Sequence, residues 1–424
     1  MSEHRVRNIP PRCSAAAEED ALLGLADDVG SLWAGGGVPT LDGPPASLAF
    51  LRDYVSKSRP CVIRNCIPLR GRGGEGGERR EVGGGSREAV LPCLTLTLDG
   101  LAEACERAGG AAAGLTLTCD ATPDGHGDCV RTCSDQQSGR RKVFVTPEER
   151  EMSLEDFRAR LRRGREGRPR PRRLRDDETA DAGDDGLAIY PILDGDGDGD
   201  GDGDGDGDGD GDGDGDVLYY SRQNDCLRRE LKPVFDLDLF PPTFAFAEEA
   251  FGTGPPDAIN MWIGDERATS SMHKDHYENL FYVLSGEKVF LLCPPADVPF
   301  LPEGEFDSGR FRRDRHGEGG WCVVPDRDGA GGGGAAAAGA RVKWIEPDLA
   351  DPRSASRFPL LDHCHPIEVR VREGEMIYLP ALWFHRVTQS CETVGLNYWY
   401  DMAFDSPGWV YFNFLQQIEV ACNE

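Results

Sequence analysis

The 424-residue sequence lacks the features of several common protein classes. No apolar run approaches the roughly 18–20 residues of a membrane-spanning helix, and residues 1–23 contain no apolar leader. We therefore expect no membrane partner and a cytoplasmic location. A basic surplus is also missing, because 75 Asp and Glu outnumber 47 Lys and Arg and give a net charge of −28. Since nucleic-acid binding needs a basic surface, no direct nucleic-acid partner is expected.

One basic block, RARLRRGREGRPRPRR at 158–173, departs from this acidic balance and is followed at once by DDETADAGDD. A charged, solvated linker is the simpler interpretation, and the block leaves a nuclear location open. The 14 cysteines show no zinc-site spacing, since Cys129-x-x-x-Cys133 and the pair Cys61 and Cys66 do not match it. In an intracellular protein we expect them to stay reduced.

Three stretches of low complexity interrupt the chain and can bury almost no apolar surface. They are GRGGEGGERREVGGGS at 71–86, the Asp-Gly run at 194–216 and GAGGGGAAAAGA at 329–340. The Asp-Gly run supplies twelve carboxylates, and we interpret it as a flexible, self-repelling tether. No register of the run provides the Glu that closes an EF-hand loop, so specific calcium binding is not predicted.

The remaining segments predict a fold that is mainly β with flanking helices, an α+β arrangement. In the first half, residues 46–58 predict a helix, 59–67 a strand, 94–108 a strand and a helix, and 141–163 a strand and a helix capped by Ser153. In the second half, short β-branched and aromatic strands are predicted at 217–223, 257–264, 279–285, 287–294, 367–374, 375–382, 385–390 and 394–402. Such a series favours a sandwich or barrel, and residues 409–421 predict a C-terminal amphipathic helix.

The stretch SSMHKDHYENLFYVLSGEKVF at 270–290 places charge inside an apolar, strand-like run. His273 and Asp275 are two apart and share one face of a strand, where an imidazole and a carboxylate need a partner or a metal. His385, in YLPALWFHRV, could supply a third ligand from a distant strand. Two histidines and one carboxylate form the facial triad of non-haem iron(II) oxygenases. The alternative is an ion pair at a strand end.

Lys288 follows the turn at Gly286, and we expect it on the strand beside the His-x-Asp face. A buried lysine requires an anion, which a dicarboxylate substrate would supply. Ser270 could donate a hydrogen bond to the same carboxylate, while Asn279 and Asn397 could supply amide donors nearby.

Other polar residues around the motif have simpler interpretations. His276 neighbours Asp275 and faces the other way, and DHCH at 362–365 is interpreted as a polar loop rather than a zinc site. Four acidic residues are candidates for a pocket rim that would suit a cationic substrate: Asp265, Glu266, Glu278 and Asp401.

The pattern HKD…SGEK…YLPALWFH…NYWYDM resembles the Jumonji-C, cupin-like iron(II)- and 2-oxoglutarate-dependent oxygenases. The small JmjC-only lysyl 3-hydroxylases of GTP-binding proteins are more similar than the large histone demethylases, since no chromatin-reader module is present. The similarity is dense over 257–298 and 367–402 and absent from the three low-complexity stretches. It implies a double-stranded β-helix, the cupin or jelly-roll core.

The resemblance also implies a role for each candidate residue. Iron(II) would be held by His273, Asp275 and His385, and 2-oxoglutarate and O2 would be the co-substrates. Lys288 would pair with the distal carboxylate of 2-oxoglutarate, Ser270 and Tyr219 would donate hydrogen bonds to it, and Asn279 and Asn397 would line the pocket. Ser270 stands where the family usually has threonine, which keeps the hydroxyl and loses a methyl group.

The expected organisation has five parts. They are an N-terminal extension at 1–45, a helix and strand part of the cupin-like domain at 46–163, an insertion at 164–216, the JmjC core at 217–402 with a loop insertion at about 303–340, and the C-terminal helix at 403–424. That helix could cover one end of the barrel or form a homodimer with a second copy.

The function implied by the resemblance is hydroxylation of a protein side chain, with lysine C-3 of a GTP-binding protein as the leading substrate. One alternative is demethylation of N-methyl-lysine or N-methyl-arginine in histones or other proteins. The other is a non-catalytic cupin scaffold, which the presence of all three candidate ligands and Lys288 disfavours.

Overall fold

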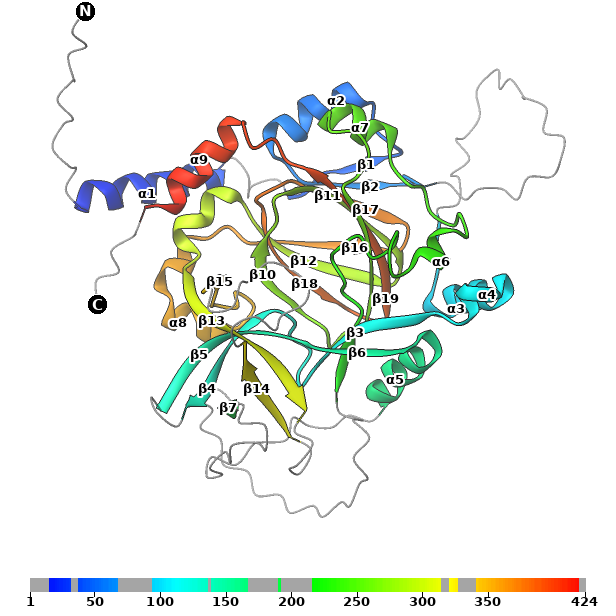
Figure 1. Ribbon diagram of the computed structural model, residues 1–424. Coiled ribbons are helices and arrows are strands. Elements are labelled where there is room, and N and C mark those ends of the chain that lie inside the picture. Colours follow the sequence, from blue (N-terminus) through cyan, green and yellow to red (C-terminus); the bar gives the residue numbers. More distant parts are fainter. Residues whose placement is uncertain are drawn as a thin grey trace, which may run out of the picture.

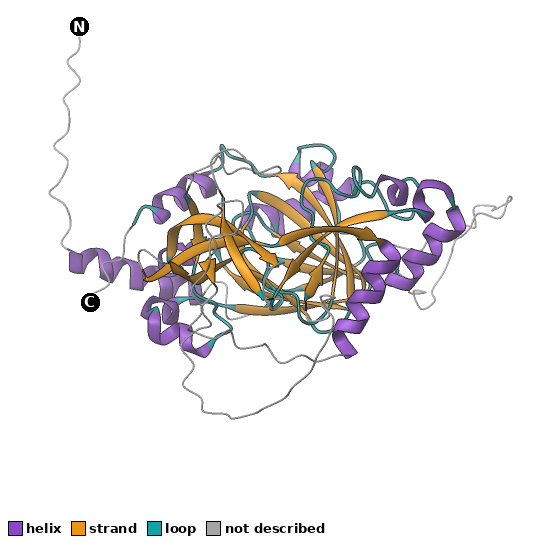
Figure 2. Ribbon diagram, turned by 60° about the horizontal axis from the view of Figure 1, so that its bottom comes forward, coloured by secondary structure: helices purple, strands orange, loops and turns teal. Residues whose placement is uncertain are grey.

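The computed structural model describes residues 15–31, 37–67, 94–135, 139–166, 190–191, 216–313, 320–326 and 341–418. The stretches at 71–86 and 329–340, and the Asp-Gly run except Asp216, lie outside these residues. Strands occupy the middle of the molecule, with helices at both ends (Figure 2). No helix in the described ranges is long and apolar enough to cross a membrane.

Two sheets form the core and confirm the mainly β fold predicted from the sequence. The larger has the order β1 (Thr40–Asp42), β2 (Cys61–Arg64), β17 (Glu375–Leu379), β11 (Tyr277–Ser285), β19 (Thr393–Asp401) and β9 (Ala258–Gly264). The smaller has the order β10 (Ser270–Lys274), β18 (Phe384–Gln389), β12 (Glu287–Cys293) and β16 (Ile367–Arg372). Phe281 and Ile377 of the larger sheet share one buried cluster with Phe290 and Val371 of the smaller, so the two sheets pack face to face.

Strand alternation explains why the larger sheet is buried on both faces. In β11, Phe281 and Val283 point toward the smaller sheet, whereas Leu280 and Tyr282 belong to a second cluster on the outer face. That outer face is covered by three helices, α2 (Ser47–Asp53), α3 (Leu98–Ala108) and α7 (Ala245–Phe251). Figure 1 shows α2 and α7 side by side above the sheet.

A further sheet lies beside the core and was not predicted as such. It consists of β4 (Cys129–Asp135), β5 (Gly139–Thr146), β13 (Glu303–Arg313), β14 (Trp321–Pro325) and β7 (Tyr190–Pro191), with β15 (Val342–Ile345) paired to β13. The loop expected at about 303–340 therefore contains two strands, and the insertion expected at 164–216 contributes a third, β7. Buried Phe311 and Val323 hold this sheet together, and the charged neighbours of Phe311 mask its apolar signal in the sequence.

A three-stranded sheet completes the structure with β6 (Glu148–Ser153), β3 (Thr116–Thr122) and β8 (Val217–Tyr219). The predicted cap of the following helix, α5 (Leu154–Glu166), is confirmed, since Ser153 Oγ accepts a hydrogen bond from Asp156 N at 3.0 Å. The strand expected at the start of 94–108 is not formed. Residues 94–97 are extended, and α3 begins directly after Thr97, whose side chain accepts from Gly100 N.

The remaining helices are short, apart from those near the two ends of the chain. They are α1 (Ala15–Val29), η2 (Val55–Lys57), α4 (Gly110–Ala113), α6 (Lys232–Phe235), η3 (Pro295–Phe300), α8 (Pro352–Arg357), η4 (Pro359–His363) and α9 (Pro407–Gln416). The expected N-terminal extension is partly built into the domain, because α1 contributes Leu22 and Ala26 to a buried cluster and β1 pairs with β2. The C-terminal helix forms as α9, which lies next to α1 in Figure 1.

Candidate metal centre

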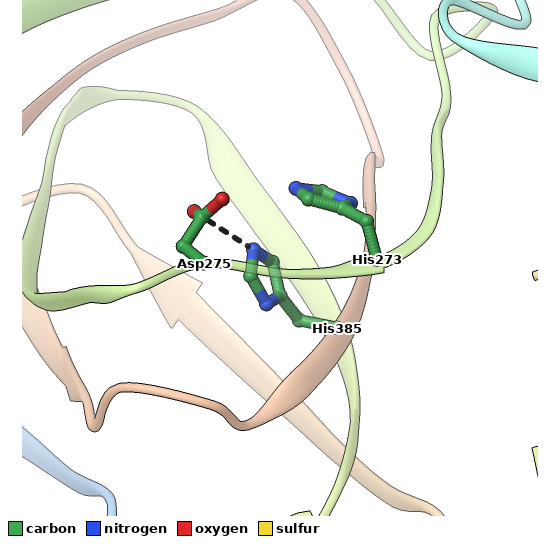
Figure 3. A group of neighbouring side chains, drawn as sticks. All are labelled: His273, Asp275 and His385. Atoms are coloured by element: carbon green, nitrogen blue, oxygen red, sulfur yellow. Dashed lines mark ion pairs between the residues drawn. The ribbon is translucent and has the colours of Figure 1, made fainter. Parts of the chain in front are cut away.

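Three predicted ligands converge at the end of the smaller sheet, where β10 and β18 pair antiparallel. The pairing places His273 directly opposite His385. Asp275 follows the end of β10, and its backbone oxygen accepts a hydrogen bond from Leu382 N at 2.9 Å, which ties it to the turn before β18. One ligating atom from each of His273, Asp275 and His385 lies within 4.8 Å of the others (Figure 3).

Backbone carbonyls fix which nitrogen of each imidazole faces the site. His273 Nδ1 lies 2.7 Å from Ser271 O, and His385 Nδ1 lies 2.9 Å from Trp383 O. Each Nδ1 must therefore carry the proton and donate it, which leaves the lone pair on Nε2 for a metal. His385 Nε2 is 3.6 Å from Asp275 Oδ2. The donor set of two imidazole nitrogens and a carboxylate fits iron(II).

Burial and mutual contact hold the three groups in their ligating forms. Burial, with the neighbouring His385, lowers the pKa of His273 to about 4. Burial alone would raise the pKa of Asp275, but its interactions with the neighbouring histidines, His385 first, outweigh burial and lower that pKa. Near neutral pH, His273 is therefore an unprotonated imidazole and Asp275 a carboxylate.

Lys288 is fully buried inside the barrel, as predicted, without a carboxylate partner among the described residues. Its ammonium donates to Tyr219 Oη at 2.9 Å and to Gln389 Oε1, and Tyr219 in turn contacts Ser270. Burial lowers the pKa of Lys288 to about 7. The structure thus brings together Lys288, Tyr219 and Ser270, and a buried cation that meets only neutral acceptors would bind an anion.

The position of Lys288 differs from the prediction in one respect. Its strand, β12, does not neighbour β10, because β18 lies between them and pairs Lys288 with Gln389. Sequence reasoning missed Gln389, although it is four residues after His385 and therefore on the same face of β18. Gln389 Nε2 donates to Asp265 O at 2.6 Å, which orients its side-chain oxygen toward Lys288.

Both predicted asparagines are buried on strands of the larger sheet. Asn279 alternates with Phe281 and Val283 along β11 and so points into the barrel, where it is 5% exposed. Its Oδ1 is buried without a hydrogen-bond partner in the described part of the chain, so this acceptor is available to a ligand. Asn397 Oδ1 instead accepts from Trp262 Nε1 at 3.0 Å, which fixes its amide.

The additional sheet supplies an aromatic wall beside the metal ligands. The ring of Trp344 stacks on His273 with centroids 6.0 Å apart and planes 7° apart, and Phe144 packs behind it at 4.7 Å. Trp344 Nε1 donates to Ser271 Oγ at 3.1 Å, next to the carbonyl that orients His273. This wall could not be predicted, because Trp344 lies about 70 residues from His273 in the sequence and on another sheet.

Two carboxylates with raised pKa values were also missed, Asp128 beside β10 and Asp120 opposite Tyr219 on β3. Ser271 Oγ donates to the backbone oxygen of Asp128, which places Asp128 beside β10. The half-buried Asp128 side chain has no ion-pair or hydrogen-bond partner among the described residues, and burial raises its pKa to about 6. Burial also raises the pKa of Asp120 to about 7, although Ser221 Oγ donates a hydrogen bond to it.

The acidic rim predicted from the sequence is only partly possible. Asp265 is fully buried and pairs with Arg267 at 2.7 Å, so it cannot belong to a rim. Glu278 accepts a hydrogen bond from Tyr378 Oη at 2.7 Å. Both carboxylates are therefore committed to contacts within the fold.

The residues set aside as ligands are indeed elsewhere. His276 lies against the rings of Phe404 and Trp409. His365 Nδ1 contacts Asp297 Oδ1 at 2.9 Å, and His363 packs on Phe300. Within the described residues, His273, Asp275 and His385 form the one group with the spacing of metal ligands.

Comparison with known proteins places this site in a family. Residues 87–406 match the family described as the Cupin-like domain, and the chain belongs to that family. It is 31% identical over 385 residues to the human bifunctional peptidase and (3S)-lysyl hydroxylase JMJD7, which covers 91% of this chain and 90% of that protein. These matches confirm the resemblance to the JmjC oxygenases.

Two further relatives match a shorter part of the chain. The lysine-specific demethylase JMJ32 of Arabidopsis thaliana is 38% identical over 211 residues, 47% of this chain and 56% of that protein. The JmjC domain-containing protein E of Dictyostelium discoideum is 36% identical over 213 residues, 47% of this chain and 57% of that protein. The match thus spans little more than half the length of these two relatives.

Proposed function

We propose that this JmjC oxygenase uses iron(II) and 2-oxoglutarate to hydroxylate a lysine side chain in a protein, at C-3. The observation that carries the proposal is the triad, in which two hydrogen-bonded Nδ1 atoms leave both Nε2 lone pairs facing Asp275. The position on lysine follows the name of the human relative, a (3S)-lysyl hydroxylase. A GTP-binding protein is the substrate that the sequence resemblance favours.

Each part of the site has a role in this reaction. Iron(II) held by His273, Asp275 and His385 would supply the oxidative chemistry, in which O2 and 2-oxoglutarate give succinate, carbon dioxide and one oxygen atom for the substrate. Lys288 would pair with the distal carboxylate of 2-oxoglutarate, and Tyr219 would hydrogen-bond to it. The apolar cluster around Phe281 and Phe290 keeps water away from this ion pair and strengthens it.

The substrate lysine would enter along the aromatic wall. Trp344 offers a flat apolar surface to the methylene groups, and the unpaired carboxylate of Asp128 would accept the ammonium. An uncompensated carboxylate at a half-buried position is unfavourable by itself. A cationic substrate would relieve that cost, which supports lysine over a neutral side chain.

Demethylation of N-methyl-lysine is a second candidate, because one relative is named a lysine-specific demethylase. The same site would serve, with hydroxylation directed to the N-methyl carbon and loss of formaldehyde. The two reactions differ in which carbon lies next to the metal.

Mass spectrometry distinguishes these functions. The purified protein is incubated with iron(II), 2-oxoglutarate and lysine-containing peptides from GTP-binding proteins of the host, with the Asp275→Ala variant as control. We expect a gain of one oxygen on lysine that the variant does not produce. Loss of methyl groups from methylated peptides would favour the demethylase instead. A protein that binds neither metal nor 2-oxoglutarate would be a scaffold, and the proposal would be wrong.

A further inference from the structure

One helix contacts the sequence neighbours of all three metal ligands. Lys274 lies between His273 and Asp275, His276 follows Asp275, and Phe384 precedes His385. Each of these three neighbours contacts an aromatic ring of α9, either Trp409 or Phe412. The contacts lie on the side of β10 and β18 that faces away from the metal.

The contact at Lys274 is a partly buried ion pair. Lys274 Nζ pairs with Glu303 Oε1 at the start of β13, and their side chains are 15% and 13% exposed. The same ammonium lies 5.3 Å from the ring centre of Phe384 and 5.7 Å from that of Phe412. Lys274 is thus held by a carboxylate and two rings, one from β18 and one from α9.

Glu303 also contacts the helix directly. Its Oε2 accepts a hydrogen bond from Gln416 Nε2 at 2.8 Å, so one carboxylate links β10, β13 and α9.

Aromatic packing joins the other two neighbours to α9. The rings of Phe384 and Phe412 lie 6.1 Å apart, and Phe412 is 3% exposed. The ring of His276 lies 5.4 Å from that of Trp409 in an edge-to-face arrangement. Because a ligand and its sequence neighbour share a peptide bond, a shift of α9 would displace the backbone that carries each ligand.

We propose that α9 positions the metal centre, so that docking of this helix and binding of the metal are energetically coupled through Lys274, Glu303 and Phe412. The inference rests on the proposed function only for the identity of the metal site. Coupling of this kind is reciprocal: the factor by which docking of α9 tightens metal binding is the factor by which the metal tightens docking.

The first test uses the unmodified protein. Hydrogen exchange of peptides covering 405–418 is measured by mass spectrometry with and without saturating Mn(II). We expect the metal to slow exchange of the backbone amides of α9, although no residue of the helix is a ligand. Equal exchange in the two samples would overturn the coupling.

The second test changes the ion pair and measures metal affinity. In Glu303→Gln the hydrogen bond to Gln416 can remain while the charge opposite Lys274 is lost. We expect Mn(II) affinity to fall about tenfold, at the low end for loss of a group that supports a metal ligand. Lys274→Met, which keeps an apolar chain between the rings of Phe384 and Phe412, should restore much of the affinity when added to Glu303→Gln.

The control is Glu375→Gln, which neutralises a carboxylate of similar exposure, 12%, that pairs with Arg64 at 2.8 Å between β2 and β17. This pair contacts none of the ligand neighbours, so Mn(II) affinity should not change. Equal affinities in wild type, Glu303→Gln and Glu375→Gln would overturn the positioning role and leave the proposed oxygenase standing. A wild-type protein that binds no Mn(II) would overturn the oxygenase itself, and the inference with it.

Discussion

At the scale of single residues, backbone carbonyls and neutral acceptors decide what the site can bind. Ser271 O and Trp383 O orient the two imidazoles, and Tyr219 and Gln389 hold the buried Lys288 without neutralising it. The site therefore presents lone pairs to a cation at one end and a positive charge to an anion further in. That polarity is what binding of a metal together with a dicarboxylate requires.

Replacing a ligand should remove activity without unfolding the protein. In Asp275→Ala or His273→Ala we expect no 2-oxoglutarate turnover. The fold should persist, because Asp275 lies beyond the end of β10 and ties to Leu382 through its backbone oxygen, which the substitution keeps. Turnover is followed by succinate formation and folding by circular dichroism. Full turnover in either variant would show that the triad is wrongly assigned.

The pKa of Lys288, about 7, makes 2-oxoglutarate affinity depend on pH. Below pH 7 the lysine is charged in the free protein and binds the dianion directly. Above pH 7 it is mostly neutral, so binding must take up a proton and the apparent Kd should rise by about tenfold per pH unit, until the pH reaches the higher pKa of the complex. Titration calorimetry with Mn(II) present, in buffers of different ionisation enthalpy, measures both the Kd and the proton uptake.

Variants separate this effect from a general influence of pH. Lys288→Ala should weaken 2-oxoglutarate binding by at least about a hundredfold, because breaking a buried charge pair costs about 3–5 kcal/mol. It should also flatten the pH profile. The control is Lys142→Ala, because Lys142 is exposed on the additional sheet and pairs with Glu346. This variant should keep the wild-type affinity for 2-oxoglutarate and the wild-type pH profile. A profile that stays steep in Lys288→Ala would assign the titration to another group.

Asp128 should determine recognition of the substrate rather than the co-substrate. Asp128→Asn keeps the size of the side chain and removes its charge. A hydrogen bond to a charged group contributes about 1.5–3 kcal/mol, so the KM for a lysine peptide should rise by about ten- to a hundredfold. The Kd for 2-oxoglutarate should stay the same. Steady-state kinetics measure the peptide KM, and a direct binding assay measures the Kd for 2-oxoglutarate. An unchanged peptide KM would show that Asp128 does not belong to the substrate site.

At the scale of elements, local patterns identified the strands that carry the site and failed for the sheet that flanks it. The neighbouring strands β11 and β12 are apolar and meet at the Gly286 turn, so their pattern was readable, whereas β10, SSMHK, buries only Met272 and was inferred from the His-x-Asp spacing. In EGEFDSGRFRR, the sequence of β13, Phe306 and Phe311 stand among charged and small residues, and the strand exists because β5 and β14 pair with it. Pairing between segments more than 150 residues apart is a tertiary effect that a local window does not contain.

The same distinction explains which site residues were predictable. His273, Asp275, His385 and Lys288 lie in motifs whose spacing carries the chemistry. Asp128 and Trp344 are ordinary residues in sequence, and their relation to His273 arises only when β4 and β15 are placed beside β10.

The additional sheet should be necessary for substrate binding. Phe311 is fully buried in the cluster that joins β4, β5, β13 and β14, and Phe311→Ala should destabilise the protein by about 3–5 kcal/mol. Chemical denaturation measures this change. At temperatures where the variant stays folded, loosening of this sheet should raise the peptide KM more than the Kd for 2-oxoglutarate, since the co-substrate site lies in the barrel. Equal effects on both would mean that the sheet supports the barrel as a whole.

At the scale of the whole molecule, the outer face of α9 remains to be explained. Val410, Tyr411 and Phe414 are 61%, 67% and 62% exposed, and Phe404 lies just before the helix and is also exposed. Apolar side chains gathered in this way mark interaction sites more often than free surface. We predict that a second copy of the chain covers them, since one helix face related by a twofold axis can bury itself.

The oligomeric state can be tested together with the positioning role of α9. Light scattering should give the mass of a dimer for the wild-type protein and of a monomer for Tyr411→Glu with Phe414→Glu. Leu48→Glu, at a residue that is 75% exposed on α2, should remain dimeric. A dimer would also press α9 onto β10 and β18, so Mn(II) affinity should fall in the monomeric variant and fall on dilution of the wild type. If the wild type is a monomer and binds Mn(II) as tightly as the variant with Tyr411→Glu and Phe414→Glu, then α9 positions the ligands without a partner.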